Sequence, residues 1–149
     1  MNTDRRNLHI ALFAAYCALM LWLLFGRSGY VDGIPYLQQL KVNPVPFRTL
    51  KLFFRLLSHR REELVRAAII NLAGNVIMFI PLGSFLPLLF QKLRKFRNTL
   101  LCVALIISIV EILQLLTLVG ICDVDDLILN LAGSAAGYAL YTLTKKPDC

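Results

Sequence analysis

Apolar residues are grouped along this chain into four long runs, separated by short polar links and by one long segment. The runs lie at about residues 8–25, 67–90, 99–122 and 127–144. Each approaches the roughly 20 apolar residues that an α-helix needs to span the hydrocarbon core of a bilayer. The pattern therefore predicts an all-α protein, an integral membrane four-helix bundle in which residues 1–149 form a single domain.

The first run follows a short basic segment, as the apolar core of a signal peptide does. The run is longer than the roughly 7–15 residues of such a core, and no Ala-x-Ala cleavage site follows Phe25. We therefore expect an uncleaved helix that stays in the membrane.

A different pattern occupies residues 46–58, in the long outer segment between the first two runs. Apolar residues recur there at helical spacing, and three cations, Arg48, Lys51 and Arg55, take the opposite face. Pro46 suits the first position of a helix. The pattern predicts a short amphipathic helix lying in the membrane interface. A lid packed on the outer ends of the membrane helices is the alternative interpretation.

Composition and charge support a membrane protein and predict its orientation. Hydrophobic residues make up 58% of the chain, whereas apolar residues are about 45–50% of a soluble domain. The net charge is +7, and three basic clusters fall on one side of the membrane if the chain crosses it four times. Because cytoplasmic segments carry the excess of Lys and Arg, we expect a multi-pass protein of the cell membrane with both termini in the cytoplasm. The clusters are Arg5 and Arg6; Lys92, Arg94, Lys95 and Arg97; and Lys145 and Lys146.

The four cysteines do not form the pattern of a disulfide framework. Cys17 and Cys102 lie in apolar runs, Cys149 lies in the inner tail, and Cys122 alone lies near the outer face. Neither a Cys-x-x-Cys pair nor a His-rich segment indicates a metal site, so no metal or other cofactor is expected.

Polar side chains in and beside the apolar runs are the candidate functional residues. Glu111 is the most unusual of them, because a charge at the centre of a bilayer costs at least about 2.5–3.5 kcal/mol. Polar residues three or four positions apart share one helix face, and all of these would lie toward the outer half of the membrane. The predicted ligand-binding cluster is Asn71, Asn75, Glu111, Gln114, Asp123, Asp126 and Asn130.

Two structural interpretations stand beside that prediction. The amides could be contacts between helices, worth about 0.6 kcal/mol each. Asp123 and Asp126 could cap the last membrane helix, where carboxylates suit the N-terminus. Asp125 would then be a solvated charge of the loop.

Small residues and prolines predict how the helices pack. The tetrad Asn-Leu-Ala-Gly occurs at 71–74 and again at 130–133, which is a faint sign of an internal duplication. Gly133 and Gly137 form a Gly-x-x-x-Gly pattern, interpreted as a close helix contact within this chain rather than a dimer contact. Pro81 removes one backbone hydrogen bond and is expected to kink its helix near mid-membrane.

The order and spacing of these residues resembles the VanZ-like family. The matching positions are Asn71-x3-Asn75-x3-Phe79-x-Pro81-x-Gly83, then Glu111-x2-Gln114, then Asp123-x-Asp125-Asp126-x3-Asn130-x2-Gly133-x3-Gly137. The segment Asn43-Pro44-Val45-Pro46-Phe47 is similar to part of that family's outer loop, so the resemblance covers about residues 43–141. One position departs from the family, because the Arg that usually precedes Asp-x-Asp-Asp is missing from residues 118–122.

The resemblance implies an envelope protein, because the family's named member is associated with teicoplanin resistance. We interpret the chain as a non-enzymatic membrane protein that lowers sensitivity to teicoplanin-type lipoglycopeptides by binding a lipid-linked or lipidated ligand in an outer-leaflet polar notch. The expected partners are membrane lipids and a lipid-linked cell-wall precursor or a lipoglycopeptide, with no nucleic acid.

Two other functions are compatible with the same residues. One is a small membrane enzyme acting on lipid headgroups or polyprenyl phosphates, with carboxylates holding a divalent metal. The sequence offers that enzyme no His base, no paired nucleophile and no phosphate-binding Gly loop. The other is a transporter subunit, which four helices and one buried acid permit.

Overall fold

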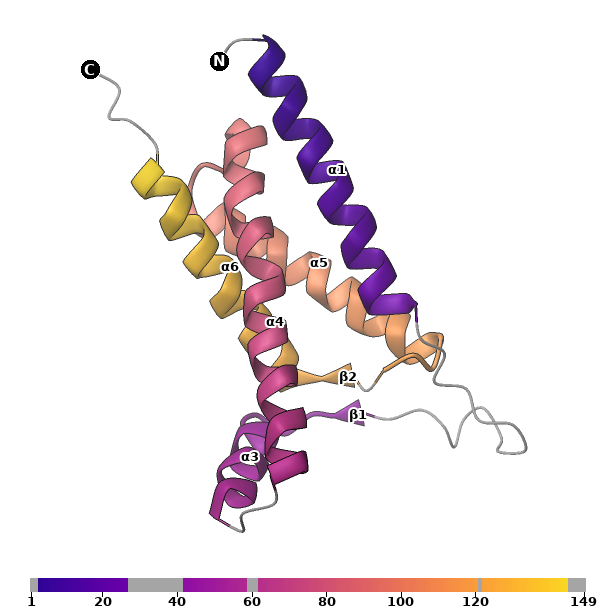
Figure 1. The fold of residues 1–149 in the computed structure, drawn as a ribbon. Coiled ribbons are helices and arrows are strands. Elements are labelled where there is room, and N and C mark those ends of the chain that lie inside the picture. The colour runs from indigo at the N-terminus through magenta and orange to yellow at the C-terminus, as the bar shows by residue number, and fades with distance from the viewer. Residues whose placement is uncertain (1–2, 27–41, 59–61, 121, 145–149) are drawn as a thin grey trace.

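The structure of the chain is a computed structural model, which describes residues 3–26, 42–58, 62–120 and 122–144. Four long helices dominate these residues: α1 (Thr3–Phe25), α4 (Glu62–Leu89), α5 (Phe96–Leu116) and α6 (Val124–Thr144). Each of the four is long and apolar enough to cross a membrane. The predicted all-α membrane bundle is therefore confirmed. Figure 1 shows the start of α1 and the end of α6 at the same end of the bundle.

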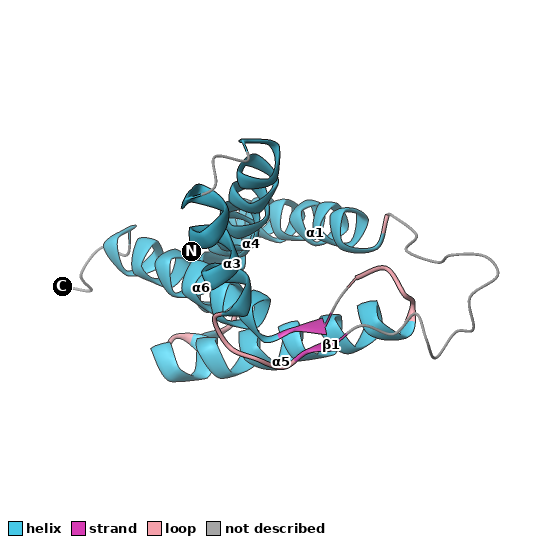
Figure 2. Cartoon of the chain, turned by 90° about the horizontal axis from the view of Figure 1, so that it is seen from below, coloured by secondary structure: helices cyan, strands magenta, loops and turns pink. Residues whose placement is uncertain are grey.

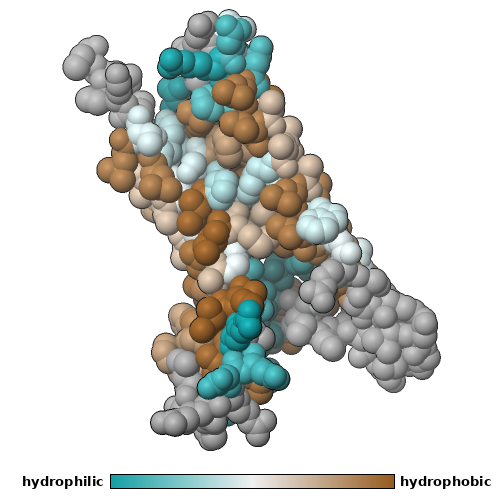
Figure 3. Space-filling model, viewed as in Figure 1, coloured by the Kyte–Doolittle hydropathy of each residue, from teal (hydrophilic) through white to brown (hydrophobic). Residues whose placement is uncertain are grey.

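Apolar side chains cover much of the outside of this bundle. In Figure 3 they spread over the middle of the face shown, while hydrophilic residues gather toward the two ends. On α1, for example, Leu12, Leu19 and Trp22 are exposed. A continuous apolar surface of this kind suits a surrounding of hydrocarbon rather than water.

The helix ends depart from the ends of the apolar runs. α5 ends at Leu116, before the predicted end at residue 122, although the residues that follow are still apolar. Leu118 takes a positive φ of 59°, and the N–H of Val119 donates to the carbonyl of Gln114 at 3.1 Å. A left-handed residue and a backward hydrogen bond of this kind are a common helix end. α4 is one helix from Glu62 to Leu89 with both of its prolines inside, and the turn η1 (Gln91–Leu93) follows it.

Two short strands lie at the end of the bundle opposite the start of α1. β1 (Val42–Asn43) pairs in parallel with β2 (Cys122–Asp123), with Val42 opposite Cys122 and Asn43 opposite Asp123. Figure 2 looks at the bundle from this end and shows the strands beside α5. The sequence predicts only helices and loops here, since two residues are too few to show the alternation of a strand.

The amphipathic helix of the outer segment is α3 (Arg48–Ser58), and it lies beside the start of α4 (Figure 1). It packs against α4 and α6, as the lid interpretation requires. Leu52 and Phe54 stay exposed, and so do the three cations Arg48, Lys51 and Arg55. Exposed apolar and basic side chains on one short helix are also what the membrane interface favours, so α3 has features of both interpretations.

α4 and α6 touch backbone to backbone. A Cβ atom at Gly133 would lie 2.1 Å from the carbonyl oxygen of Val76, and one at Gly137 would lie 1.9 Å from that of Ile80. Across the same contact, the hydroxyl of Ser84 donates to the carbonyl of Gly137 at 2.7 Å. The Gly-x-x-x-Gly pattern is therefore occupied by a helix of the same chain, which is how small residues let membrane helices approach closely.

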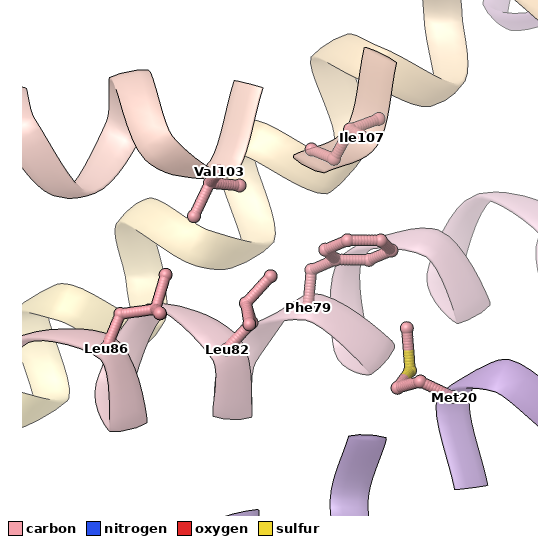
Figure 4. Close-up of a cluster of buried hydrophobic side chains, with 6 residues drawn as sticks. All are labelled: Met20, Phe79, Leu82, Leu86, Val103 and Ile107. Carbon is pink, nitrogen blue, oxygen red and sulfur yellow. The ribbon is translucent and has the colours of Figure 1, made fainter. Parts of the chain in front are cut away.

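A small apolar core joins α1, α4 and α5. Its buried side chains point toward one another in Figure 4 and are Met20, Phe79, Leu82, Leu86, Val103 and Ile107. The hydroxyl of Tyr16 on α1 also donates to the carbonyl of Met78 on α4 at 2.8 Å. Figures 1 and 2 place α4 between α1 and α6, so α1 leans against one side of the tight α4–α6 pair.

Candidate functional site

An open cleft of about 500 Å³ lies between the four long helices at the end that carries the strands. Four of the seven predicted site residues line it: Asn71 and Asn75 from α4, Gln114 from α5 and Asp126 from α6. We call it the polar cleft. Its other lining residues are Leu23, Leu24, Ile70, Gly74, Met78 and Val119, so the polar groups lie among apolar walls.

Asn75 links the polar side chains of the cleft. Its Nδ2 donates to Oδ1 of Asn71 at 3.2 Å and also to Oδ1 of Asp126. An amide nitrogen carries two hydrogens, so one group serves both bonds. A carboxylate has about four acceptor sites, which leaves Asp126 able to accept donors from a ligand as well.

Gln114 occupies the opposite wall of the polar cleft and fastens the end of α1. Its Nε2 donates to the carbonyl of Leu24 at 3.0 Å. The last carbonyls of a helix lack partners within that helix, so this bond satisfies one of them. The bond fixes where Leu24 lies, and Leu24 is itself a wall of the cleft.

Glu111 and Asp123 line a different pocket, of about 170 Å³, together with Ser108, Cys122 and Leu127. Glu111 is only 8% exposed. Its Oε2 accepts a hydrogen bond from the backbone N–H of Asp123 at 3.2 Å. Burial raises the pKa of the Cys122 thiol, and the charges of Glu111 and Asp123 raise it further. Glu111 therefore lines a different pocket from the residues of the polar cleft.

Residues 123–126 carry three carboxylates, and we call this segment the acidic turn. Two of these carboxylates accept hydrogen bonds from residues 43 and 47 and from the start of α6. Asp123 precedes α6 and accepts the N–H of Asp125 at 2.9 Å through Oδ1, which is the geometry of a helix N-cap. Its Oδ2 accepts Nδ2 of Asn43 at 3.0 Å. The carboxylate of Asp125 accepts the N–H of Phe47, whose φ is 62°. Asp126 is then the carboxylate of this turn that faces the polar cleft.

The interpretation of Asp125 as a solvated loop charge is wrong, because its side chain is only 1% exposed. The backbone N–H of Phe47 donates to its carboxylate. The sequence did not indicate that Asn43 and Phe47 donate hydrogen bonds to carboxylates of the acidic turn. The sequence marked these two residues only through the similarity of the Asn-Pro-Val-Pro-Phe segment to a family loop. That similarity did not indicate which residues they contact.

Asn130 lies one helical turn after Asp126 and is 4% exposed. Its Oδ1 has no hydrogen-bond partner among the residues that the structure describes. A buried polar atom left in that state costs about 1–3 kcal/mol. Asn130 is therefore buried beside the candidate site but does not line the polar cleft itself.

Within the described ranges, no group of three or more His, Cys, Asp or Glu side chains is placed to hold a metal ion. Arg48 is the first residue of α3 and lies near the acidic turn, where its guanidinium donates to Oδ1 of Asn43 at 3.4 Å. Arg48 thus reaches the residue that holds Asp123 rather than the cleft.

A family model described as VanZ/LLP1 matches residues 13–145 of the chain. No curated protein and no solved structure matches the chain. The matched range includes both pockets and every residue of the predicted ligand-binding cluster.

Proposed function

Because the chain belongs to the VanZ/LLP1 family, we propose that this membrane protein binds an amphiphilic ligand at the outer face of the bacterial cell membrane. The ligand is lipid-linked or lipidated, and its polar part occupies the polar cleft. Binding lowers sensitivity to teicoplanin-type lipoglycopeptides. The observation that carries the proposal is the meeting of Asn71, Asn75 and Asp126 at one open cleft, which Gln114 also lines and whose remaining walls are apolar.

The size and lining of the cleft support a binding role. Ligand sites are commonly about 300–1,000 Å³, mostly apolar, with a few placed polar groups. The polar cleft has about 500 Å³ of space, and Leu24, Ile70 and Met78 are among its walls. The carboxylate of Asp126 suits hydroxyl or ammonium donors, so a hydroxyl-rich or cationic head group fits the polar side.

The arrangement of basic residues supports the outer position of the cleft. The polar cleft, α3 and the strands lie at the end opposite the start of α1 (Figure 1). Arg5 and Arg6 lie at the start of α1, and four more cations lie in and beside the α4–α5 link. The positive-inside rule assigns those segments to the cytoplasm, and the cleft then faces outward.

The geometry favours binding over a metal-dependent enzyme. That enzyme needs the carboxylates to surround one metal ion with oxygen ligands. Glu111 and Asp126 line different pockets, and Asp123 and Asp125 already accept hydrogen bonds from the outer segment. A side chain that holds the fold together is poorly placed to reorganise around an ion.

Replacing the carboxylate of Asp126 by an amide tests the proposal. Asp126→Asn keeps the shape of the side chain and one oxygen that can accept from Asn75, but it removes the charge and replaces the other acceptor oxygen by a donor. We expect this variant to lose most of the ligand that co-purifies in native nanodiscs, measured by lipid mass spectrometry. It should also lower teicoplanin tolerance in a sensitive host at matched expression.

The matched control is Glu63→Gln, the same chemical change on an exposed residue in the first turn of α4. It should retain both the co-purifying ligand and the tolerance of the wild type. Wild-type ligand occupancy and tolerance in Asp126→Asn would contradict the proposed function.

A further inference from the structure

An apolar groove of about 190 Å³ runs between α1 and the facing sides of α4 and α5. Cys17, Met20 and Leu24 line it from α1, with Phe79 from α4 and Val110 from α5. We call it the apolar groove. Tyr16 also lines it, but the hydroxyl of Tyr16 is already bonded to the carbonyl of Met78.

The apolar groove begins where the polar cleft ends. Leu24 is a wall of both. On α4, Met78 lines the cleft and the next residue, Phe79, lines the groove. The two spaces are therefore neighbours that share a wall at Leu24, the cleft with hydrogen-bonding groups and the groove with hydrocarbon walls.

The position of α1 explains why the groove suits a hydrocarbon chain. Lipid tails are as apolar as leucine, so no hydrophobic force closes membrane helices onto one another. Side chains that face a void lose their dispersion contacts. Two polar bonds hold α1 beside this space, one from Tyr16 to Met78 and one from Gln114 to Leu24. A chain entering the groove would gain contacts without breaking either bond.

We propose that the polar cleft and the apolar groove hold a single amphiphile, with its head in the cleft and one hydrocarbon chain in the groove between α1 and α4. This inference rests on the proposed function and narrows the ligand class. The head is uncharged or cationic and carries hydroxyl or amine donors, because the cleft presents the carboxylate of Asp126 and amide groups. An anionic head would meet that carboxylate as a like charge.

Cys17 provides a native reporter of the groove, and Cys102 provides the control. Both thiols are free and half-buried, but Cys102 does not line the groove. The experiment measures alkylation of the two cysteines by N-ethylmaleimide, peptide by peptide, in wild-type protein in phosphatidylcholine nanodiscs. The probes are an alkyl maltoside, lysophosphatidylglycerol with a chain of equal length, and free maltose.

The alkyl maltoside should slow alkylation of Cys17 about tenfold relative to Cys102 at saturation. Lysophosphatidylglycerol, with an anionic head, and maltose, with no chain, should leave the ratio unchanged. Equal protection of Cys17 by the alkyl maltoside and by lysophosphatidylglycerol would overturn the inference, because ordinary partitioning into the bilayer would then explain the protection. Absence of protection by the alkyl maltoside would overturn it as well.

A second measurement separates this inference from the proposed function. Val110→Phe fills the groove, and Leu105→Phe adds the same ring at an exposed position of α5. Val110→Phe should weaken retention of the co-purifying ligand about tenfold, the effect of losing roughly two buried methylenes, while Leu105→Phe retains it. If Asp126→Asn loses the ligand and Val110→Phe does not, the proposed function stands and the groove has no role. If neither variant loses the ligand, both ideas fail.

Discussion

Two glycines that end the same tetrad should respond in opposite ways to the same substitution. Gly133 faces α4 so closely that an added Cβ would lie 2.1 Å from the carbonyl oxygen of Val76. Ordinary carbon–oxygen contacts are about 3.3–3.6 Å, so Gly133→Ala requires the two helices to separate by roughly 1 Å. Such overpacking costs about 1–3 kcal/mol. Gly74 has no atom within 4 Å of the equivalent position, so Gly74→Ala should gain up to about 1 kcal/mol of helix propensity.

The comparison is measured by heating each variant in the same detergent and following the monodisperse fraction by size-exclusion chromatography. We expect the midpoint of Gly133→Ala to fall below that of the wild type and the midpoint of Gly74→Ala to equal or exceed it. Gly133→Leu should not yield a folded protein, because a larger side chain must enter the same contact. A Gly133→Ala protein as stable as Gly74→Ala would refute the close α4–α6 contact as the basis of the fold.

The acidic turn and Cys122 give two further predictions. Asp125→Ala should speed hydrogen exchange at the backbone of residues 42–48, because the N–H of Phe47 loses its acceptor at a cost of about 1–3 kcal/mol. Asp125→Asn keeps an acceptor and should not speed the exchange. Equal exchange in both variants would argue against this contact. Cys122 should be labelled slowly by an impermeant maleimide at neutral pH on intact cells, or on spheroplasts if an outer membrane is present, because its raised pKa lowers the thiolate fraction. Labelling of Cys122 should accelerate as the pH rises. Glu111→Gln should accelerate it at a given pH, because the variant removes a charge that raises the pKa of the Cys122 thiol. An unreactive Cys122 alongside a labelled Cys149 would invert the proposed topology.

The four membrane helices could be predicted because each is a local property of the sequence. Length and hydropathy are enough to identify a helix that spans a bilayer. The end of α5 could not be predicted in this way, because the residues after Leu116 remain apolar. What ends the helix is the left-handed backbone at Leu118, and leucine gives no local signal for that conformation.

The candidate site shows a similar division between local and tertiary information. Helical spacing correctly placed Asn71 and Asn75 side by side, and their side chains share a hydrogen bond. The same reasoning could not decide which direction each helix face points, because packing against other helices sets the rotation of a helix about its axis. Spacing also could not show where one pocket ends and the next begins: Glu111 and Gln114 share a face by spacing but line two different pockets.

The close contact between α4 and α6 also accounts for the position of the cleft. Because glycines let these two helices approach closely, the ends that carry the cleft bring Asn75 and Asp126 within hydrogen-bonding distance. α1 instead joins the bundle through a small core, through ring contacts of Phe13 and Tyr16 with Phe85, and through the hydrogen bonds of Tyr16 and Gln114. One wall of the cleft and groove is thus the closely packed α4–α6 pair, and the other is α1. The head-group site proposed above lies against the pair, and the proposed chain site lies between α1 and the facing sides of α4 and α5.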